Sequence, residues 1–173
     1  SRQFILNIYL VVIKIGKKVP YLKENTIITI NPLKNNIRKI DFEINLLALE
    51  ENLTIGGSED EKGYSGFSVR VILPDDVVFS GPAGEVKPEN TAVESPGYIN
   101  ISGSMGAEGT KAGVAILDHP SNPGYPQPWI LRNAKSMQNA AFPGNKLYPV
   151  STDKPLKLRY SLFVYNGTIN DHK

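Results

Sequence analysis

The sequence predicts an all-β protein that folds as an antiparallel β-sandwich. Apolar and polar residues alternate along several runs, which is typical of strands with one buried face. Turn residues separate these runs about every ten positions, and no stretch has a helical period. Strands joined by such short connections pair with antiparallel neighbours, because parallel pairing needs long crossovers. At 173 residues the chain is expected to form a single domain over 1–173 with a sizeable core.

The N-terminal run Phe4–Ile15 is the most hydrophobic segment of the chain. Its Ile, Val and Tyr residues predict a buried strand. It is shorter than the roughly 20 residues that a helix needs to cross a bilayer, and Asn7 and Lys14 interrupt it. It also lacks a small-residue cleavage site, so we expect neither a membrane span nor a signal peptide here. The next predicted strand, Thr26–Ile30, is short and β-branched.

Three longer runs alternate strongly, namely Ile37–Leu49, Phe67–Leu73 and Leu156–Tyr165. In the last run Leu158 and its alternate neighbours are apolar, whereas Arg159 and its neighbours are mostly polar. This pattern predicts half-buried antiparallel strands. The remaining predicted strands are shorter apolar runs: Leu53–Ile55, Val77–Phe79, Tyr98–Ile101, Gly113–Leu117 and Trp129–Leu131.

Composition excludes several classes of function. The net charge is only +2, from 19 Lys and Arg against 17 Asp and Glu, and the basic residues are scattered. A nucleic-acid partner needs clustered positive charge, so none is expected. There is no cysteine, which excludes disulfides and thiolate chemistry. With two histidines and no recognisable ligand spacing, the sequence predicts no metal site and no cofactor.

The strongest candidate site is the segment Gly113–Arg132, in which an apolar run leads into a loop stiffened by four prolines. His119 in this loop is a candidate general acid or base, oriented by Asp118 or Asn122. The alternative is a loop histidine that bonds to its own turn. Trp129 offers either a stacking surface for a sugar or a plug for one end of the sandwich. The substrate-binding candidates of the segment are Asn122, Tyr125, Trp129 and Arg132.

A second candidate segment lies between two predicted strands, where glycines surround Lys62 and Tyr64. Glycine in such positions allows backbone to approach a ligand or a neighbouring strand closely. Arg70 follows on the polar face of the next strand. If that face lines a cleft, its guanidinium suits a carboxylate or vicinal hydroxyls; otherwise Arg70 is an ordinary surface residue.

Three segments together resemble a bacterial family of unknown function often labelled "methane oxygenase PmoA", or PmoA-like. They are Gly56–Arg70, Gly113–Arg132 with its His-Pro-x-Asn-Pro signature, and Leu158–Gly167. The resemblance extends over about Ile37–Gly167. It implies a galactose-mutarotase-like supersandwich, of which this chain resembles the C-terminal half. It also implies secreted or periplasmic proteins found beside polysaccharide-degrading enzymes, although the composition fits a cytoplasmic protein equally well.

The predicted function is carbohydrate association, either sugar binding or sugar-directed acid–base chemistry; whether the chain is an enzyme stays open. In the catalytic version His119 moves a proton while Arg70 or Lys62 stabilises negative charge, with all candidates meeting in one cleft. One alternative is a structural or interaction module without a small ligand, and another is a metal-dependent oxygenase. The expected partners are a carbohydrate and either a further copy or a missing N-terminal half.

Overall fold

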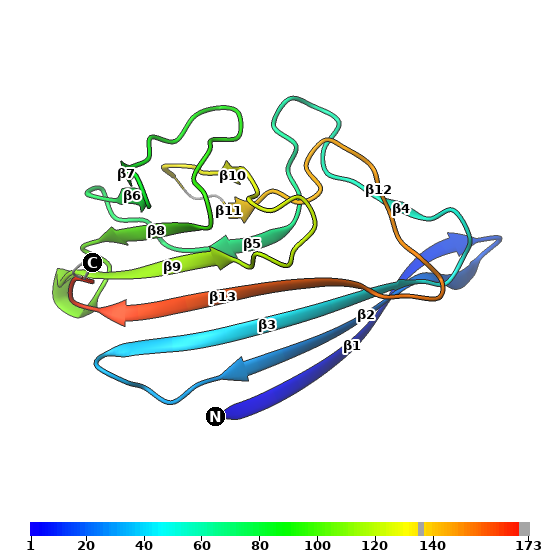
Figure 1. The fold of residues 1–173 in the computed structure, drawn as a ribbon, viewed down its shortest axis with the longest axis horizontal. Coiled ribbons are helices and arrows are strands. Elements are labelled where there is room, and N and C mark those ends of the chain that lie inside the picture. The colour runs from blue at the N-terminus through cyan, green and yellow to red at the C-terminus, as the bar shows by residue number, and fades with distance from the viewer. Residues whose placement is uncertain (135–136, 170–173) are drawn as a thin grey trace.

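The computed structural model describes residues 1–134 and 137–169 and shows two packed layers of antiparallel strands (Figure 1). One layer is an eight-stranded sheet in the order β1-β2-β3-β13-β9-β8-β6-β7. The other contains a three-stranded sheet, β10-β11-β5, accompanied by the two-stranded ribbon β12-β4. Within the described residues the one helical element is a 3-10 turn at Ala107–Gly109. The predicted all-β, antiparallel sandwich is therefore confirmed.

The large sheet is built from long strands at one side and short strands at the other. Its members are β1 (Arg2–Lys14), β2 (Lys17–Ile30), β3 (Ile37–Ala48), β13 (Leu156–Asn166), β9 (Ala112–Asp118), β8 (Tyr98–Gly103), β6 (Val78–Gly81) and β7 (Gly84–Glu85). The strands of the second layer are β10 (Trp129–Ile130), β11 (Met137–Ala140), β5 (Phe67–Arg70), β4 (Thr54–Ile55) and β12 (Tyr148–Pro149).

The core lies between the two layers. Its centre is fully buried and apolar, with Ile99, Ile101 and Ile116 from the large sheet against Trp129 and Leu131. Aromatic rings extend it toward β3, where Phe67 stacks on Tyr160 at a centroid distance of 4.6 Å. The alternation read from the sequence explains this packing, because every second residue of a strand points to the same face.

Strand register assigns the two faces of the large sheet. Phe42 of β3 pairs with Tyr160 of β13 on the core side, and the next pair, Glu43 and Arg159, points away from the core. We call the second side the outer face. In the four long strands it carries the odd-numbered residues Gln3–Tyr9, Lys23–Thr29, Lys39–Leu47 and Lys157–Phe163. The second layer packs on the opposite side, so the outer face is open to a ligand.

The N-terminal segment forms a strand, but the prediction that it is buried is wrong. Side chains of β1 on both faces are exposed: Ile5 at 60% and Tyr9 at 54% lie on the outer face, and Phe4 at 50% lies on the other. The reason is its position at the edge of the sheet, where β2 is its one neighbouring strand and most of it lies beyond the second layer; Leu10 is the residue of β1 that packs against a buried cluster, with Leu22 and Val150. An apolar strand of this composition has the same sequence pattern whether or not a second layer covers it, so the sequence does not predict its exposure.

Strand β11 was absent from the sequence prediction because its central residues are polar. Gln138 and Asn139 are nevertheless fully buried. The Gln138 amide accepts from Arg132 N at 2.8 Å and donates to Arg132 O at 3.0 Å, and Asn139 Nδ2 donates to Ser65 O. These bonds replace water for the Gln138 amide and for the Asn139 Nδ2 group, whereas Asn139 Oδ1 is buried without a hydrogen-bond partner in the described residues. A strand that resembles a loop by composition thus lies inside the sandwich.

Candidate functional site

The proline-rich loop between β9 and β10 is held in place by a buried asparagine. The Asn122 Nδ2 donates to Asp118 Oδ1 and to the Arg159 carbonyl, both at 2.7 Å, and its Oδ1 accepts from Arg159 N at 2.7 Å. Both hydrogens of the amide are therefore used within the protein. Asn122 therefore has a structural role that fastens the loop to β13, and its predicted contact with substrate stays a prediction.

Asp118 is the buried acid of this loop. Its carboxylate accepts from Asn122 Nδ2 and from the backbone N of Gln127, and the structure places no cation against it among the described residues. Burial raises the pKa of Asp118 above its ordinary value, although these hydrogen bonds and nearby His119 act in the other direction. The loop thus depends on a carboxyl group that is harder to ionise in the folded protein than in the unfolded chain.

The raised pKa of Asp118 predicts a pH dependence of stability. A carboxyl whose folded pKa is raised stabilises the fold below its unfolded pKa and loses that contribution as pH rises through the folded value. Urea unfolding of the wild type and of Asp118→Asn from pH 4 to pH 7 measures this. We expect the stability advantage of the wild type over the variant to shrink as pH rises, and a constant difference would contradict the assignment.

The two aromatic residues of the loop differ in exposure. Trp129 is fully buried, and its Nε1 donates to the Ser95 carbonyl at 2.8 Å, so its ring has no face for a sugar. Of the two predicted roles, the plug of the sandwich is the one that this burial fits. Tyr125 is 38% exposed and keeps an accessible ring.

Arg132 and Tyr64, both predicted to line one cleft, bond directly to each other inside the protein. Arg132 Nε donates to the Tyr64 hydroxyl at 2.8 Å, and its guanidinium lies 5.2 Å from the Tyr64 ring centre. Its two Nη atoms donate to the carbonyls of Glu89 and Asn90. Most of the N–H donors of Arg132 therefore tie two loops together, and its predicted contact with substrate stays a prediction.

The other two charged candidates are exposed and lie elsewhere. Lys62 sits in the turn before Tyr64, with its backbone N bonded to Asp60 Oδ1 at 3.1 Å. Arg70, at the end of β5, lines a cavity of about 910 Å³ beside Phe79, Glu85 and Asn133. His119 is not among the residues that line this cavity.

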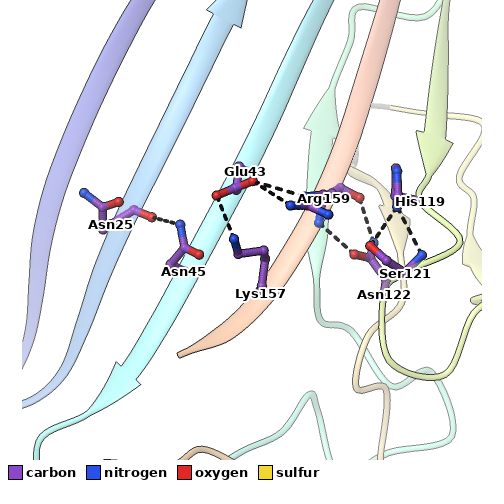
Figure 2. A network of polar contacts seen from close by, with 8 residues as sticks. All are labelled: Asn25, Glu43, Asn45, His119, Ser121, Asn122, Lys157 and Arg159. Carbon is purple, nitrogen blue, oxygen red and sulfur yellow. Dashed lines mark hydrogen bonds and ion pairs between the residues drawn. The ribbon is translucent and has the colours of Figure 1, made fainter. Parts of the chain in front are cut away.

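His119 opens onto a different hollow, a groove of about 390 Å³ on the outer face, which we call the His119 groove. The residues that line it are Gln3, Ile27, Thr29, Lys39, Asp41, Phe42, Glu43, His119, Arg159, Tyr160 and Ser161. Four neighbouring strands thus contribute, and the loop after β9 brings in the imidazole (Figure 2). The hollow lies where the outer face meets the proline-rich loop.

The His119 ring has one nitrogen held and one free in the described part of the chain. Its Nδ1 accepts from Ser121 N at 3.1 Å and lies 2.8 Å from the Ser121 hydroxyl. Because Nδ1 accepts, the neutral ring carries its hydrogen on Nε2. The structure thus shows the bond of His119 to its own turn, one of the two roles weighed for this residue, and its role as a general acid or base stays a prediction.

The charged groups of the groove form opposite pairs. Lys157 and Arg159 approach Glu43 at 3.2 and 3.1 Å (Figure 2), and Lys39 approaches Asp41 at 2.9 Å. Lys157, with Arg159, holds the pKa of Glu43 below its ordinary value against the effect of burial. Partial burial raises the pKa of Asp41, but hydrogen bonds from Ser161, Lys39 and Asn31 outweigh it and leave the value lowered. Both carboxylates are thus ionised at neutral pH.

The expected single cleft is therefore divided among three places. His119 follows β9 and faces the outer side of the large sheet, whereas Arg70, Tyr64 and Arg132 belong to the second layer on its core side. Sequence reasoning missed Glu43 and Arg159, although both stand on the polar face of an alternating run. Their meeting depends on the pairing of β3 with β13, which no local pattern encodes.

In the described residues no three His, Cys, Asp or Glu side chains gather in a way that could hold a metal ion; His172 lies outside them. None of the described helices is long and apolar enough to cross a membrane. Comparison with curated proteins finds no match, and comparison with solved structures finds none either. A family model matches residues 14–173, and the chain therefore belongs to that family, a family of unknown function (DUF6807).

Proposed function

We propose that this chain binds a neutral carbohydrate in the His119 groove. The observation that carries the proposal is the lining of this hollow, in which imidazole, guanidinium, carboxylate and hydroxyl groups converge on one open space. A sugar hydroxyl both donates and accepts hydrogen bonds, so it suits a wall that presents both kinds of partner. Pockets that bind small polar molecules orient them through a few such convergent groups.

Binding fits the groove better than catalysis. Glycoside hydrolysis uses a carboxylic acid whose pKa is raised, so that it can donate a proton at neutral pH. In this groove the pKa values of Asp41 and Glu43 are instead lowered. His119 is the one imidazole in the lining of the groove, and neither carboxyl group beside it has the raised pKa that an acid catalyst needs.

The resemblance to PmoA-like proteins and to the galactose-mutarotase supersandwich supports the same class of ligand, since both imply a setting of sugar chemistry. We extend the proposal accordingly to a single sugar-binding sandwich domain over 1–173 that works in a secreted or periplasmic setting.

The test is the affinity of His119→Ala for glycans that bind the wild type, measured by isothermal titration calorimetry. The His119 ring is exposed and bonds within its own turn, so we expect its loss to leave folding intact. The affinity is expected to fall about tenfold, the equivalent of one hydrogen bond to a ligand. Lys34→Ala, an exposed residue of the turn between β2 and β3, is the matched control and should keep wild-type affinity.

One observation favours a second candidate, a structural or interaction module. Asn122, Trp129 and Arg132 satisfy their polar groups inside the protein, as expected of a loop that closes one end of a sandwich. A glycan array on which the folded wild type binds nothing would select this alternative and would overturn the proposed function.

A further inference from the structure

We infer that the His119 groove, whose lining already runs from β13 to β1, is part of a wider track on the outer face that also includes Asn7, Tyr9, Asn25 and Asn45 and holds an extended, neutral glycan chain. This inference rests on the proposed function and names the ligand more narrowly. The occupant is a polysaccharide or long oligosaccharide that runs across the strands, with one unit beside His119 and further units over β2 and β1.

Strand register lays out the track as three rows on the outer face. One row crosses from Gln3 through Thr29 and Asp41 to Ser161, and the last row from Asn7 through Asn25 and Asn45 to Lys157. The central row is Ile5, Ile27, Glu43 and Arg159. Four neighbouring strands are about 14 Å across, which exceeds the width of one sugar ring. The rows therefore offer room for more than one unit.

The chemistry of the rows matches the two aspects of a sugar ring. Over β1 and β2 the central row is apolar, and Ile5 is 60% exposed. Amides flank it: Asn25 Nδ2 donates to Asn7 Oδ1 at 3.0 Å, and Asn45 Nδ2 donates to the Asn25 carbonyl at 3.3 Å. A pyranose presents apolar C–H groups on its face and hydroxyls at its rim. Its face suits the isoleucines, and its rim suits the amides.

An aromatic ring adjoins the far end of the track. Tyr9 follows Asn7 on the same face of β1, is 54% exposed, and has the Lys23 ammonium 6.0 Å from its ring centre. An exposed tyrosine supplies a large apolar surface together with a polar hydroxyl, a combination suited to stacking on a sugar. The edge strand, whose exposure the sequence did not predict, thereby gains a role in ligand binding.

The ion pairs of the track favour a neutral polymer. Asp41 has Lys39 at 2.9 Å, and Glu43 has Lys157 and Arg159 at 3.2 and 3.1 Å, so every carboxylate of the track already has a cationic partner. A polyanion would compete with Asp41 and Glu43 for these cations, and a polycation would compete for the carboxylates. A neutral chain accepts hydrogen bonds from the pairs and leaves them intact.

The test is the dependence of affinity on chain length, measured by calorimetry with neutral glucan, mannan and xylan series from the monosaccharide to the hexasaccharide. We expect the best series to gain about tenfold or more between the disaccharide and the pentasaccharide, because added units reach β2 and β1. Asn25→Ala and Tyr9→Ala should remove most of this gain and leave disaccharide affinity unchanged. Asn90→Ala, an exposed asparagine away from the outer face, is the control.

Four outcomes would count against the track. Equal affinity for short and long chains, with His119→Ala weakening both, would overturn the track and keep the proposed function. Long-chain affinity that survives both Asn25→Ala and Tyr9→Ala would do the same. Failure of every series to bind would overturn both. Sedimentation that shows a dimer dissociated by Ile5→Lys and unaffected by glycans would assign the β1 surface to a second copy instead.

Discussion

Replacing Trp129 with alanine is expected to lower the free energy of unfolding by about 3–5 kcal/mol, the range for truncating a fully buried tryptophan. Trp129 is fully buried between the two layers, and its Nε1 donates to the Ser95 carbonyl. The variant loses the apolar contacts of the ring, creates a cavity and leaves a carbonyl without its partner. Equilibrium unfolding in urea, followed by far-UV circular dichroism, measures the change.

Trp129→Phe separates packing from hydrogen bonding. Phenylalanine keeps an apolar ring in the site but leaves the Ser95 carbonyl without its donor, so a smaller loss of about 1–3 kcal/mol is expected. If Trp129→Ala destabilised the fold by less than about 1 kcal/mol, the ring would not be the plug that its burial indicates. A ligand-stacking role would then have to be reconsidered.

Replacing Asn122 with alanine is expected to lower the free energy of unfolding by about 2–4 kcal/mol, because it leaves buried polar groups without their hydrogen-bond partners. The amide N–H and carbonyl of Arg159 lose their bonds at 2.7 Å, and Asp118 loses its nearest side-chain donor. Thermal and urea unfolding of the purified variant measure the loss. A change within about 0.5 kcal/mol, as at an ordinary surface position, would contradict the structural role of Asn122.

Asn122→Asp is the matched variant, nearly equal in size but charged. It places a second carboxylate beside Asp118, and two such neighbours cannot both ionise at little cost. The pKa of the pair is therefore raised in the folded state, and stability is present at low pH and lost as pH rises. We expect the variant to approach wild-type stability near pH 4 and to fall well below it by pH 8. A pH-independent deficit would show that the two carboxyl groups do not interact.

The fold class could be predicted from sequence because alternation is a local property. The runs Ile37–Leu49 and Leu156–Tyr165 appear as β3 and β13, and the short run at Trp129 appears as β10. What alternation does not encode is whether a second layer covers a strand, which is why the exposure of β1 was missed. Strand β11 was missed for the opposite reason, since its buried Gln138 and Asn139 resemble loop residues until their partners are known.

The candidate site was predicted less completely, for a related reason. The loop composition identified His119 and the importance of Asn122, and the structure places the imidazole at an open groove. The residues opposite, Glu43 and Arg159, are brought there by the pairing of strands 116 residues apart along the chain. Arg132 and Tyr64 were expected in one cleft with His119 and instead bond to each other, while the carbonyls that Arg132 contacts come from a loop without any marked pattern.

The central claim is that carbohydrate binds on the outer face at His119. The most direct measurement is two-dimensional NMR of the labelled protein during titration with the best-binding neutral oligosaccharide. We expect the chemical-shift changes to concentrate on the His119 ring, the Arg159 guanidinium and the backbone of β3 around Glu43. Shifts confined to Arg70 and the cavity beside β5, or no shifts at saturating glycan, would contradict it.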